Sequence, residues 1–267
     1  MSVVGGLLLV ACTSGGDIAP TQTPIASPAA KVVEVGATEY EFSVPSHVVG
    51  GVVTMRFANT GSLPHEFAFG RLDPGRGQED VRQVFESKEE PPDWMHDVAG
   101  VPALSPGRSV TVTRMLEPAT YVFFCFFPSP DGTPHARLGM YATFQIAGET
   151  GDAPPPADLA ISAGGQGLSV PEITAGKHTV ELRNEGPGAH GFLILRPEDP
   201  EATFEQVFAS VEKWFEGGLA GPAPTAFIGG MQSISAGTSV FETIKFEAGT
   251  YIVWDEDSDD SVTVTVS

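Results

Sequence analysis

Short runs of alternating apolar and polar residues recur along most of the chain, and many of the apolar members are β-branched or aromatic. Alternation with a period of two predicts half-buried strands. The clearest runs in the first part of the chain are Val52–Phe57, Ser109–Met115 and Tyr141–Ile146. Those in the second part are Thr179–Leu182, Val240–Phe246 and Val262–Val266. Because Gly and Pro separate these runs, we expect short strands joined by turns.

One segment in each part follows the spacing of a helix instead. The apolar residues of these segments are Val81, Val84 and Phe85, and then Phe204, Val207, Phe208 and Val211. Residues spaced i, i+3, i+4 and i+7 share one helix face, so each part is predicted to contain one helix. Asp199 followed by Pro200 is typical of a helix start and predicts the beginning of the second helix.

The chain also matches itself at a long distance. Asn59–Phe67 and Asn184–Phe192 share the pattern Asn-x-Gly-x-x-x-His-x-Phe at an offset of 125 residues. Glu117–Cys125 and Glu247–Asp255 share the pattern Glu-x-x-Thr-Tyr at an offset of 130 residues. Two matches at nearly the same offset indicate a duplication. A period this long indicates tandem domains, because solenoid repeats run about 20 to 50 residues.

We therefore predict an all-β protein of two tandem Greek-key β-sandwich domains, each with one short helical insertion. The Pro-rich segment 149–157 is predicted to be a stiff linker between a first domain, 31–148, and a second domain, 158–267. Residues 1–30 are predicted to form an export signal and a flexible tether, since the stretch after the apolar start cannot build a core.

The charge balance narrows the range of partners. Lys and Arg number 14 against 34 Asp and Glu, which makes the net charge −20. This charge opposes contact with a phosphate backbone and argues against nucleic acid as a partner. It favours a basic protein partner, although solubility outside the cell explains the acidity as well.

The apolar start of the chain ends in Leu9–Cys12, with the sequence Leu-Val-Ala-Cys. This tetrapeptide resembles the lipobox of bacterial lipoproteins, and the resemblance implies that the signal is cut before Cys12 and that this Cys is lipidated. About ten apolar residues are too few to span a bilayer roughly 30 Å thick. We expect an exported lipoprotein, anchored on the outer side of the cytoplasmic membrane or in the periplasm. The alternative is a soluble exported protein with a Cys in its signal.

A lipidated Cys12 leaves Cys125 as a lone thiol, which metal ligation would explain. His135 follows Cys125 after nine intervening residues, Met140 follows His135 after four, and His65 supplies a second imidazole upstream. Two His, one thiolate and a weak axial Met suit both oxidation states of copper, because soft sulfur favours Cu(I) and imidazole binds either form. Zinc is the alternative metal, disfavoured because Met is a poor zinc ligand.

At these residues the sequence resembles the cupredoxins, the blue copper proteins of the plastocyanin and azurin type. The resemblance covers both halves as a fold and implies one type 1 copper in the first domain, held by His65, Cys125, His135 and Met140. The Tyr-x-x-x-Cys approach and the His-x-x-x-x-Met spacing fit the small cupredoxins, whereas the gap of nine residues between Cys and His is longer than in those carriers.

The second domain has lost this site, because Asp255 stands where Cys125 does and no His or Met follows it. His190 remains at the first-ligand position, and we interpret it as a hydrogen-bonded structural residue rather than a metal ligand. The acidic run Glu256–Asp260 is interpreted as a solvated hairpin tip, with calcium binding as the alternative.

Copper nitrite reductases and laccase-like oxidases also carry tandem cupredoxin domains, with a His beside the blue-copper Cys that leads to a second copper centre. Here Phe124 and Phe126 flank the Cys, and His47, His96 and His178 are scattered singly. We therefore expect a protein that is not an enzyme.

The predicted function is a one-electron carrier that cycles between Cu(II) and Cu(I), with a redox protein such as a cytochrome or an oxidase as its partner and the membrane reached by the lipid anchor. The alternative is a copper-handling or surface binding module, in which the metal is cargo or structural.

Overall fold

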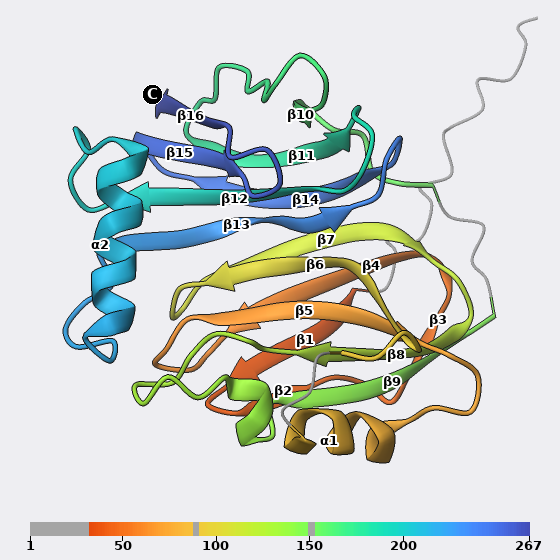
Figure 1. Cartoon of the computed structure of the whole chain (residues 1–267). Coiled ribbons are helices and arrows are strands. Elements are labelled where there is room, and N and C mark those ends of the chain that lie inside the picture. Colours follow the sequence, from red (N-terminus) through yellow and green to blue (C-terminus); the bar gives the residue numbers. More distant parts are fainter. Residues whose placement is uncertain (1–31, 88–90, 149–152) are drawn as a thin grey trace, which may run out of the picture.

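The computed structural model describes residues 32–87, 91–148 and 153–267. Its regular structure is mostly β-strand, arranged in two halves that follow one another along the chain (Figure 1). We call residues 32–148 the first half and residues 153–267 the second half. Each half is a β-sandwich with one α-helix, which confirms the all-β fold class predicted from the alternating runs.

The first half contains nine strands. They are β1 (Val33–Thr38), β2 (Glu41–Ser43), β3 (His47–Val49), β4 (Gly51–Asn59), β5 (His65–Leu72), β6 (Met95–Leu104), β7 (Ser109–Leu116), β8 (Ala119–Phe124) and β9 (Tyr141–Ala147). One layer has the order β2-β1-β4-β7 and the other has β3-β9-β8-β5-β6. The helix α1 (Gln78–Ser87) connects β5 to β6, and a 3-10 helix η1 (His135–Leu138) precedes β9.

The second half repeats this plan. Its strands are β10 (Leu159–Ala163), β11 (Gly176–Asn184), β12 (His190–Pro197), β13 (Thr225–Ile234), β14 (Ser239–Phe246), β15 (Gly249–Asp255) and β16 (Ser261–Val266). One layer is β10-β11-β14 and the other is β13-β12-β15-β16. The parallel pair β10 and β11 repeats the parallel pair β1 and β4 of the first half. The helix α2 (Phe204–Glu216) stands beside the sheet that contains β12 and β13 (Figure 1).

The two halves share one continuous sheet. β7 pairs antiparallel with β14, with Val112 opposite Glu242, so the seven strands run β10-β11-β14-β7-β4-β1-β2. In the opposite layer β6 and β13 lie side by side. Near the end of β6 the amide of Ser105 donates to the carbonyl of Phe227 at 3.1 Å, and the amide of Phe227 donates to the Ser105 hydroxyl at 2.9 Å. One main hydrophobic core extends through both halves.

Both predicted helices are present, but α2 begins later than expected. Its N-cap is Thr203, whose hydroxyl accepts from the amide of Gln206 while the Gln206 side chain accepts from the amide of Thr203. This reciprocal arrangement is a capping box. The prediction that Asp199 and Pro200 start the helix was wrong, because the Asp199 carboxylate instead accepts from the amide of Glu201 in the preceding turn.

Candidate metal centre

His65 is positioned by the side chain of Asn59, at the end of β4. The Asn59 amide group donates to the carbonyls of Leu63 at 2.8 Å and Leu104 at 2.7 Å, and its oxygen accepts from the amide of Gly61 at 2.9 Å. These bonds tie the turn to β6 and bring the chain into β5 at its first residue, His65. A Cβ atom at Gly61 would lie 2.7 Å from Nε2 of His65, so this turn needs a glycine for the imidazole to fit.

Cys125 follows directly after β8, and the loop beyond it returns to the same place. The amide of His135 donates to the carbonyl of Phe127 at 3.0 Å, and the amide of Ala136 donates to the carbonyl of Cys125 at 2.7 Å. Between these contacts, Ser129–Thr133 folds into a tight hairpin of its own, closed by a 2.9 Å bond from the amide of Ser129 to the carbonyl of Thr133. The additional residues between Cys125 and His135 therefore form a hairpin that lies outside the candidate metal centre.

Met140 lies beside the same residues. Gly139, with a φ of 104° at the end of η1, turns the chain in a conformation that glycine adopts readily. The amide of Met140 then donates to the carbonyl of His135 at 3.0 Å, and the amide of Cys125 donates to the carbonyl of Met140 at 3.3 Å. Met140 is fully buried. These contacts fix its backbone at the site, while ligation by its thioether stays a prediction.

The ligand atoms of His65, Cys125 and His135 converge at one buried point, within 4.8 Å of one another. The two Nδ1 atoms are 3.1 Å apart, and the sulfur lies 4.0 Å from Nδ1 of His65 and 3.5 Å from Nδ1 of His135. A cation about 2.0 to 2.1 Å from each nitrogen and about 2.3 Å from sulfur would require separations of about 3 to 4 Å between these atoms. The three residues therefore fit a single metal ion.

Burial sets the protonation of these ligands. Loss of solvent is the main cause that lowers the pKa of His65 to about 4, and the neighbouring imidazole of His135 adds to it. Loss of solvent also lowers the pKa of His135 to about 4. Both imidazoles therefore keep a free lone pair at neutral pH. Burial raises the pKa of the Cys125 thiol, so binding of a metal must displace its proton.

Glu66 touches the ligands in a way that the sequence analysis did not anticipate. Its amide donates to the sulfur of Cys125 at 3.3 Å, and its carboxylate accepts from the amide of Phe126 at 3.0 Å. The first contact orients the thiolate and the second fastens the loop beside it. The only sequence signal for this role is the position of Glu66 next to His65, because the contacts join residues 59 and 60 positions apart.

Aromatic rings cover the histidines. The ring of Tyr40 meets His135 edge-on at a centroid distance of 5.0 Å, and the ring of Phe127 lies 6.0 Å from it. Of the four Phe residues nearest Cys125 in sequence, Phe126 is 42% exposed. The neighbours that are buried are Phe123, Phe124 and Phe127.

The loop that carries the ligands also contacts the second half. The Phe127 ring packs against Phe215 of α2 at a centroid distance of 5.5 Å and against Phe227 of β13 at 6.1 Å. At the hairpin tip, a Cβ atom at Gly218 would come within 2.7 Å of the Pro130 carbonyl oxygen. The additional loop residues thus pack against the end of α2.

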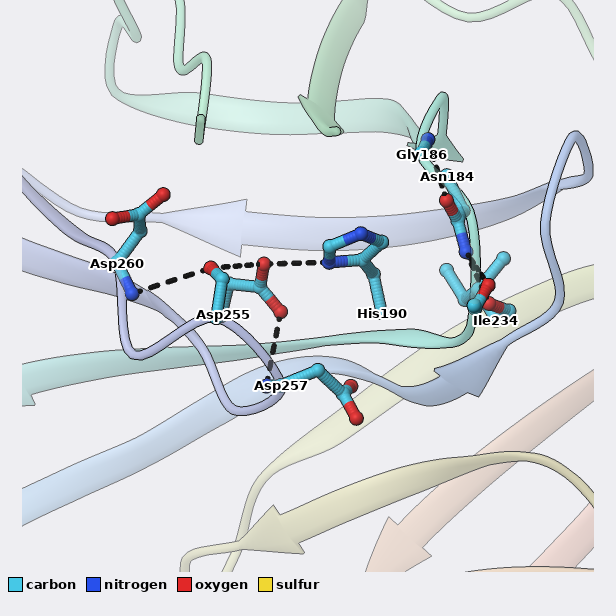
Figure 2. A network of polar contacts seen from close by, with 9 residues as sticks. Asn184, Gly186, His190, Ile234, Asp255, Asp257 and Asp260 are labelled. Atoms are coloured by element: carbon cyan, nitrogen blue, oxygen red, sulfur yellow. Dashed lines mark hydrogen bonds and ion pairs between the residues drawn. The ribbon is translucent and has the colours of Figure 1, made fainter. Parts of the chain in front are cut away.

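At the corresponding place in the second half, a hydrogen bond joins the two equivalent positions. Nδ1 of His190 lies 2.7 Å from a carboxylate oxygen of Asp255 (Figure 2). The same oxygen accepts from the hydroxyl of Ser258 at 2.6 Å. Asn184 holds the turn before His190 as Asn59 does in the first half, with its oxygen accepting from the amide of Gly186 at 2.9 Å (Figure 2). His190 is therefore a hydrogen-bonded residue, as the sequence indicated.

The other histidines lie apart from this centre. His47 and His96 are exposed, and His178 pairs with Asp158 at 2.6 Å. Among the described residues, His65, Cys125 and His135 form the single group of three or more His, Cys, Asp or Glu side chains close enough to share a metal. Cys12, the predicted lipidation site, lies outside the described residues. In the part of the chain that the structure describes, no helix has the length and apolar character needed to cross a membrane.

A scan against models of known protein families finds no match, and a search of curated proteins finds none either.

Solved structures that resemble this chain include blue copper proteins and a multicopper oxidase. Reduced auracyanin from the photosynthetic bacterium Roseiflexus castenholzii is 25% identical over 45% of this chain and 99% of its own, with a TM-score of 0.32. Auracyanin A, a blue copper protein from Chloroflexus aurantiacus, is 21% identical over 44% of this chain and 98% of its own, with a TM-score of 0.30. A multicopper oxidase is 16% identical over 89% of each chain, with a TM-score of 0.28. The candidate metal ligands are therefore identified from the distances between side chains of this chain, and not from these structures.

Proposed function

We propose that this protein is an exported type 1 copper protein that acts as a one-electron carrier. The observation that carries the proposal is the convergence of two imidazole nitrogens and one thiol sulfur at a fully buried point of the first half. Soft sulfur with two nitrogens is a donor set that accommodates both Cu(II) and Cu(I). Bound copper would supply reversible one-electron chemistry at this point.

The residues of the chain would each have a distinct role in this function. His65 and His135 would donate nitrogen, Cys125 would provide the thiolate, and the thioether of Met140 would tune the potential. Strand β5 and the loop between β8 and β9 hold these ligands from two directions. Because the turn at Asn59 and the amide of Glu66 restrain them, the ligands would move little between the two oxidation states.

Burial of the candidate ligands also supports the proposal of an electron carrier. His65, Cys125 and His135 are all 0% exposed, so a bound metal would be shielded from water and from competing ligands. Burial of this kind suits a retained redox centre better than metal that is handed on as cargo. The residues on either side of Cys125 are Phe124 and Phe126, which offer no ligand for a second copper. We therefore propose a carrier rather than an enzyme.

The setting of this function is proposed from the sequence. The Leu-Val-Ala-Cys segment ending at Cys12 supports export and a lipid anchor, on the outer side of the cytoplasmic membrane or in the periplasm. The net charge of −20 would attract a basic redox partner, of the cytochrome or oxidase type, and would repel nucleic acid.

The deciding experiment is the visible and EPR spectrum of the Cu(II)-loaded protein, with metal quantitation. We expect an intense thiolate-to-copper band, a narrow hyperfine splitting and one copper per chain. Cys125→Ala should abolish the band while the far-UV circular dichroism stays unchanged. His135→Ala should alter the spectrum, whereas His47→Ala, the matched control at an exposed histidine, should not. Retention of the colour in Cys125→Ala would refute the proposal. Rapid loss of Cu(I) to a chelator would favour the copper-handling alternative.

A further inference from the structure

A second candidate site lies between the halves, next to the metal centre but distinct from it. A cavity of about 220 Å³ extends between α2, strands of the second half and the loop that follows Cys125. Its walls are mostly apolar and include several aromatic rings. The aromatic residues that line it are Phe127, Phe208, Phe215, Phe227 and Trp254.

One end of this cavity is polar and acidic. Glu66, Gln232 and Glu256 line it there, and the same three residues also line a neighbouring cleft of about 430 Å³. They therefore stand at the junction of an apolar chamber and a more open one. Glu66 comes from the first half, while Gln232 and Glu256 come from the second, so the polar end depends on the way the halves are joined.

Within the described lining of the two cavities, no positively charged side chain stands against these carboxyl groups, since none of the lining residues is Lys, Arg or His. Loss of solvent, with the neighbouring carboxylates of Glu66, Asp257 and Asp255, raises the pKa of Glu256 to about 7. A carboxylate in such surroundings is stabilised by any cation that enters, because the cation supplies the missing opposite charge.

The shape and the walls define the class of ligand further. Pockets for drug-sized molecules measure about 300 to 1,000 Å³, so the apolar chamber suits a smaller molecule of one ring. Faces of Phe and Trp rings attract both aromatic rings and cations. An apolar ring with a short, positively charged arm would place its ring in the chamber and its charge at the junction.

We propose that this cavity binds a small primary ammonium compound with a single aromatic ring, its ammonium group held by Glu256 and Glu66 and its ring between α2 and Phe127. The inference goes beyond electron transfer and does not rest on it, because the metal-free chain contains the same cavity residues. The ligand would bridge the two halves beside the loop that carries Cys125 and His135.

The test is calorimetric titration of the full chain with benzylamine and with two analogues of similar shape, neutral benzyl alcohol and anionic benzoate. We expect benzylamine to bind at least tenfold more tightly than benzyl alcohol, and benzoate not to bind. Metal-free and copper-loaded chains should behave alike, because the ammonium group contacts carboxylates rather than copper. Equal affinity for all three compounds, or binding of benzylamine only to the copper-loaded chain, would overturn the proposal.

Substitutions of residues that line the cavity test where benzylamine binds. Glu256→Gln should weaken benzylamine about tenfold and leave benzyl alcohol unchanged. Asp259→Asn is the matched control, because it removes the same charge from the same hairpin at a residue that does not line the cavity. Its φ of 59° is one that Asn tolerates. Val211→Phe should fill the chamber and weaken benzylamine and benzyl alcohol together. If Glu256→Gln and Asp259→Asn have the same effect, the site is refuted.

Discussion

Nδ1 of His190 lies 2.7 Å from a carboxylate oxygen of Asp255, at the positions that His65 and Cys125 occupy in the first half. The Asp255 side chain is 1% exposed and that of His190 is 11% exposed. In the second half a buried hydrogen bond between a histidine and an aspartate thus joins β12 to the end of β15, where the first half has a histidine and a cysteine. A hydrogen bond between two side chains lies where the first half has two candidate metal ligands.

Breaking this pair should destabilise the protein. Asp255→Ala leaves a buried histidine without its hydrogen-bond partner, and we expect the free energy of unfolding to fall by about 2 kcal/mol. Urea denaturation of the metal-free protein measures it. Asp158→Ala is the control, because it breaks a His–Asp pair of similar length in which Asp158 is 56% exposed. That change should cost about 1 kcal/mol or less. Equal losses in the two variants would contradict a structural role for the buried pair.

Gly61→Ala should weaken metal binding. The added Cβ would lie 2.7 Å from Nε2 of His65 and 2.7 Å from a carboxylate oxygen of Glu39, so the imidazole must shift away from its partners. We expect the affinity for Cu(II) to fall about 10- to 100-fold, as is typical when support of a ligand is lost. Competition with a chelator measures this affinity. Gly36→Ala, whose Cβ would have its nearest neighbour at 3.8 Å, should leave it unchanged. Matching affinities for both variants would show that the turn does not hold the imidazole.

Shortening the loop should preserve the metal centre. If Pro130–Gly132 is replaced by Asn-Gly, a two-residue turn can join Ser129 to Thr133, whose backbone hydrogen bond already closes this hairpin, without moving Cys125. We expect one copper per chain and an unchanged EPR spectrum. Because the contact of Pro130 with Gly218 is lost, the melting temperature should fall. A changed spectrum would mean that the hairpin shapes the site itself.

Glu256 should make stability depend on pH. Its pKa is about 7 in the folded chain against about 4.5 for an ordinary glutamate, so the folded state binds the proton more tightly than the unfolded state. Stability is therefore lost as the pH rises from about 4.5 to 7. Glu256→Gln should match the wild type near pH 4 and exceed it at pH 8, measured as melting temperature of the metal-free protein. The Asp259→Asn variant should follow the wild type at both values. A pH-independent difference between Glu256→Gln and the wild type would contradict this shift.

Much of the fold could be predicted because it depends on patterns of residues that are close together in the sequence. Val240–Phe246 alternates in sequence and lies in β14, and the two Asn-x-Gly turns precede His65 and His190 at the starts of β5 and β12. The start of α2 was also encoded locally, by Thr203 and Gln206 spaced as a capping box. Asp199 and Pro200 also resemble a helix start, but the helix begins where Thr203 and Gln206 form the capping hydrogen bonds.

Other features could not be predicted, because they join distant residues. Pairing of β7 with β14 places Val112 opposite Glu242, and no pattern within either strand specifies that neighbour. The same holds for Glu66, whose contacts with Cys125 and Phe126 depend on how β5 packs beside β8. Exposure of Phe126 likewise follows from the direction of the loop, although its neighbours in sequence are buried.

The sequence by itself determined the strand pattern, the duplication and the residue types available for a metal, because each depends on side-chain chemistry and on spacing along the chain. Only the tertiary structure decided that His65, Cys125 and His135 meet within 4.8 Å. It also joined the halves through one sheet and placed Glu66 and Glu256 at a shared cavity. The physical reason is that a site needs atoms to meet in three dimensions, and strand register and sheet packing set those distances for residues far apart in the chain.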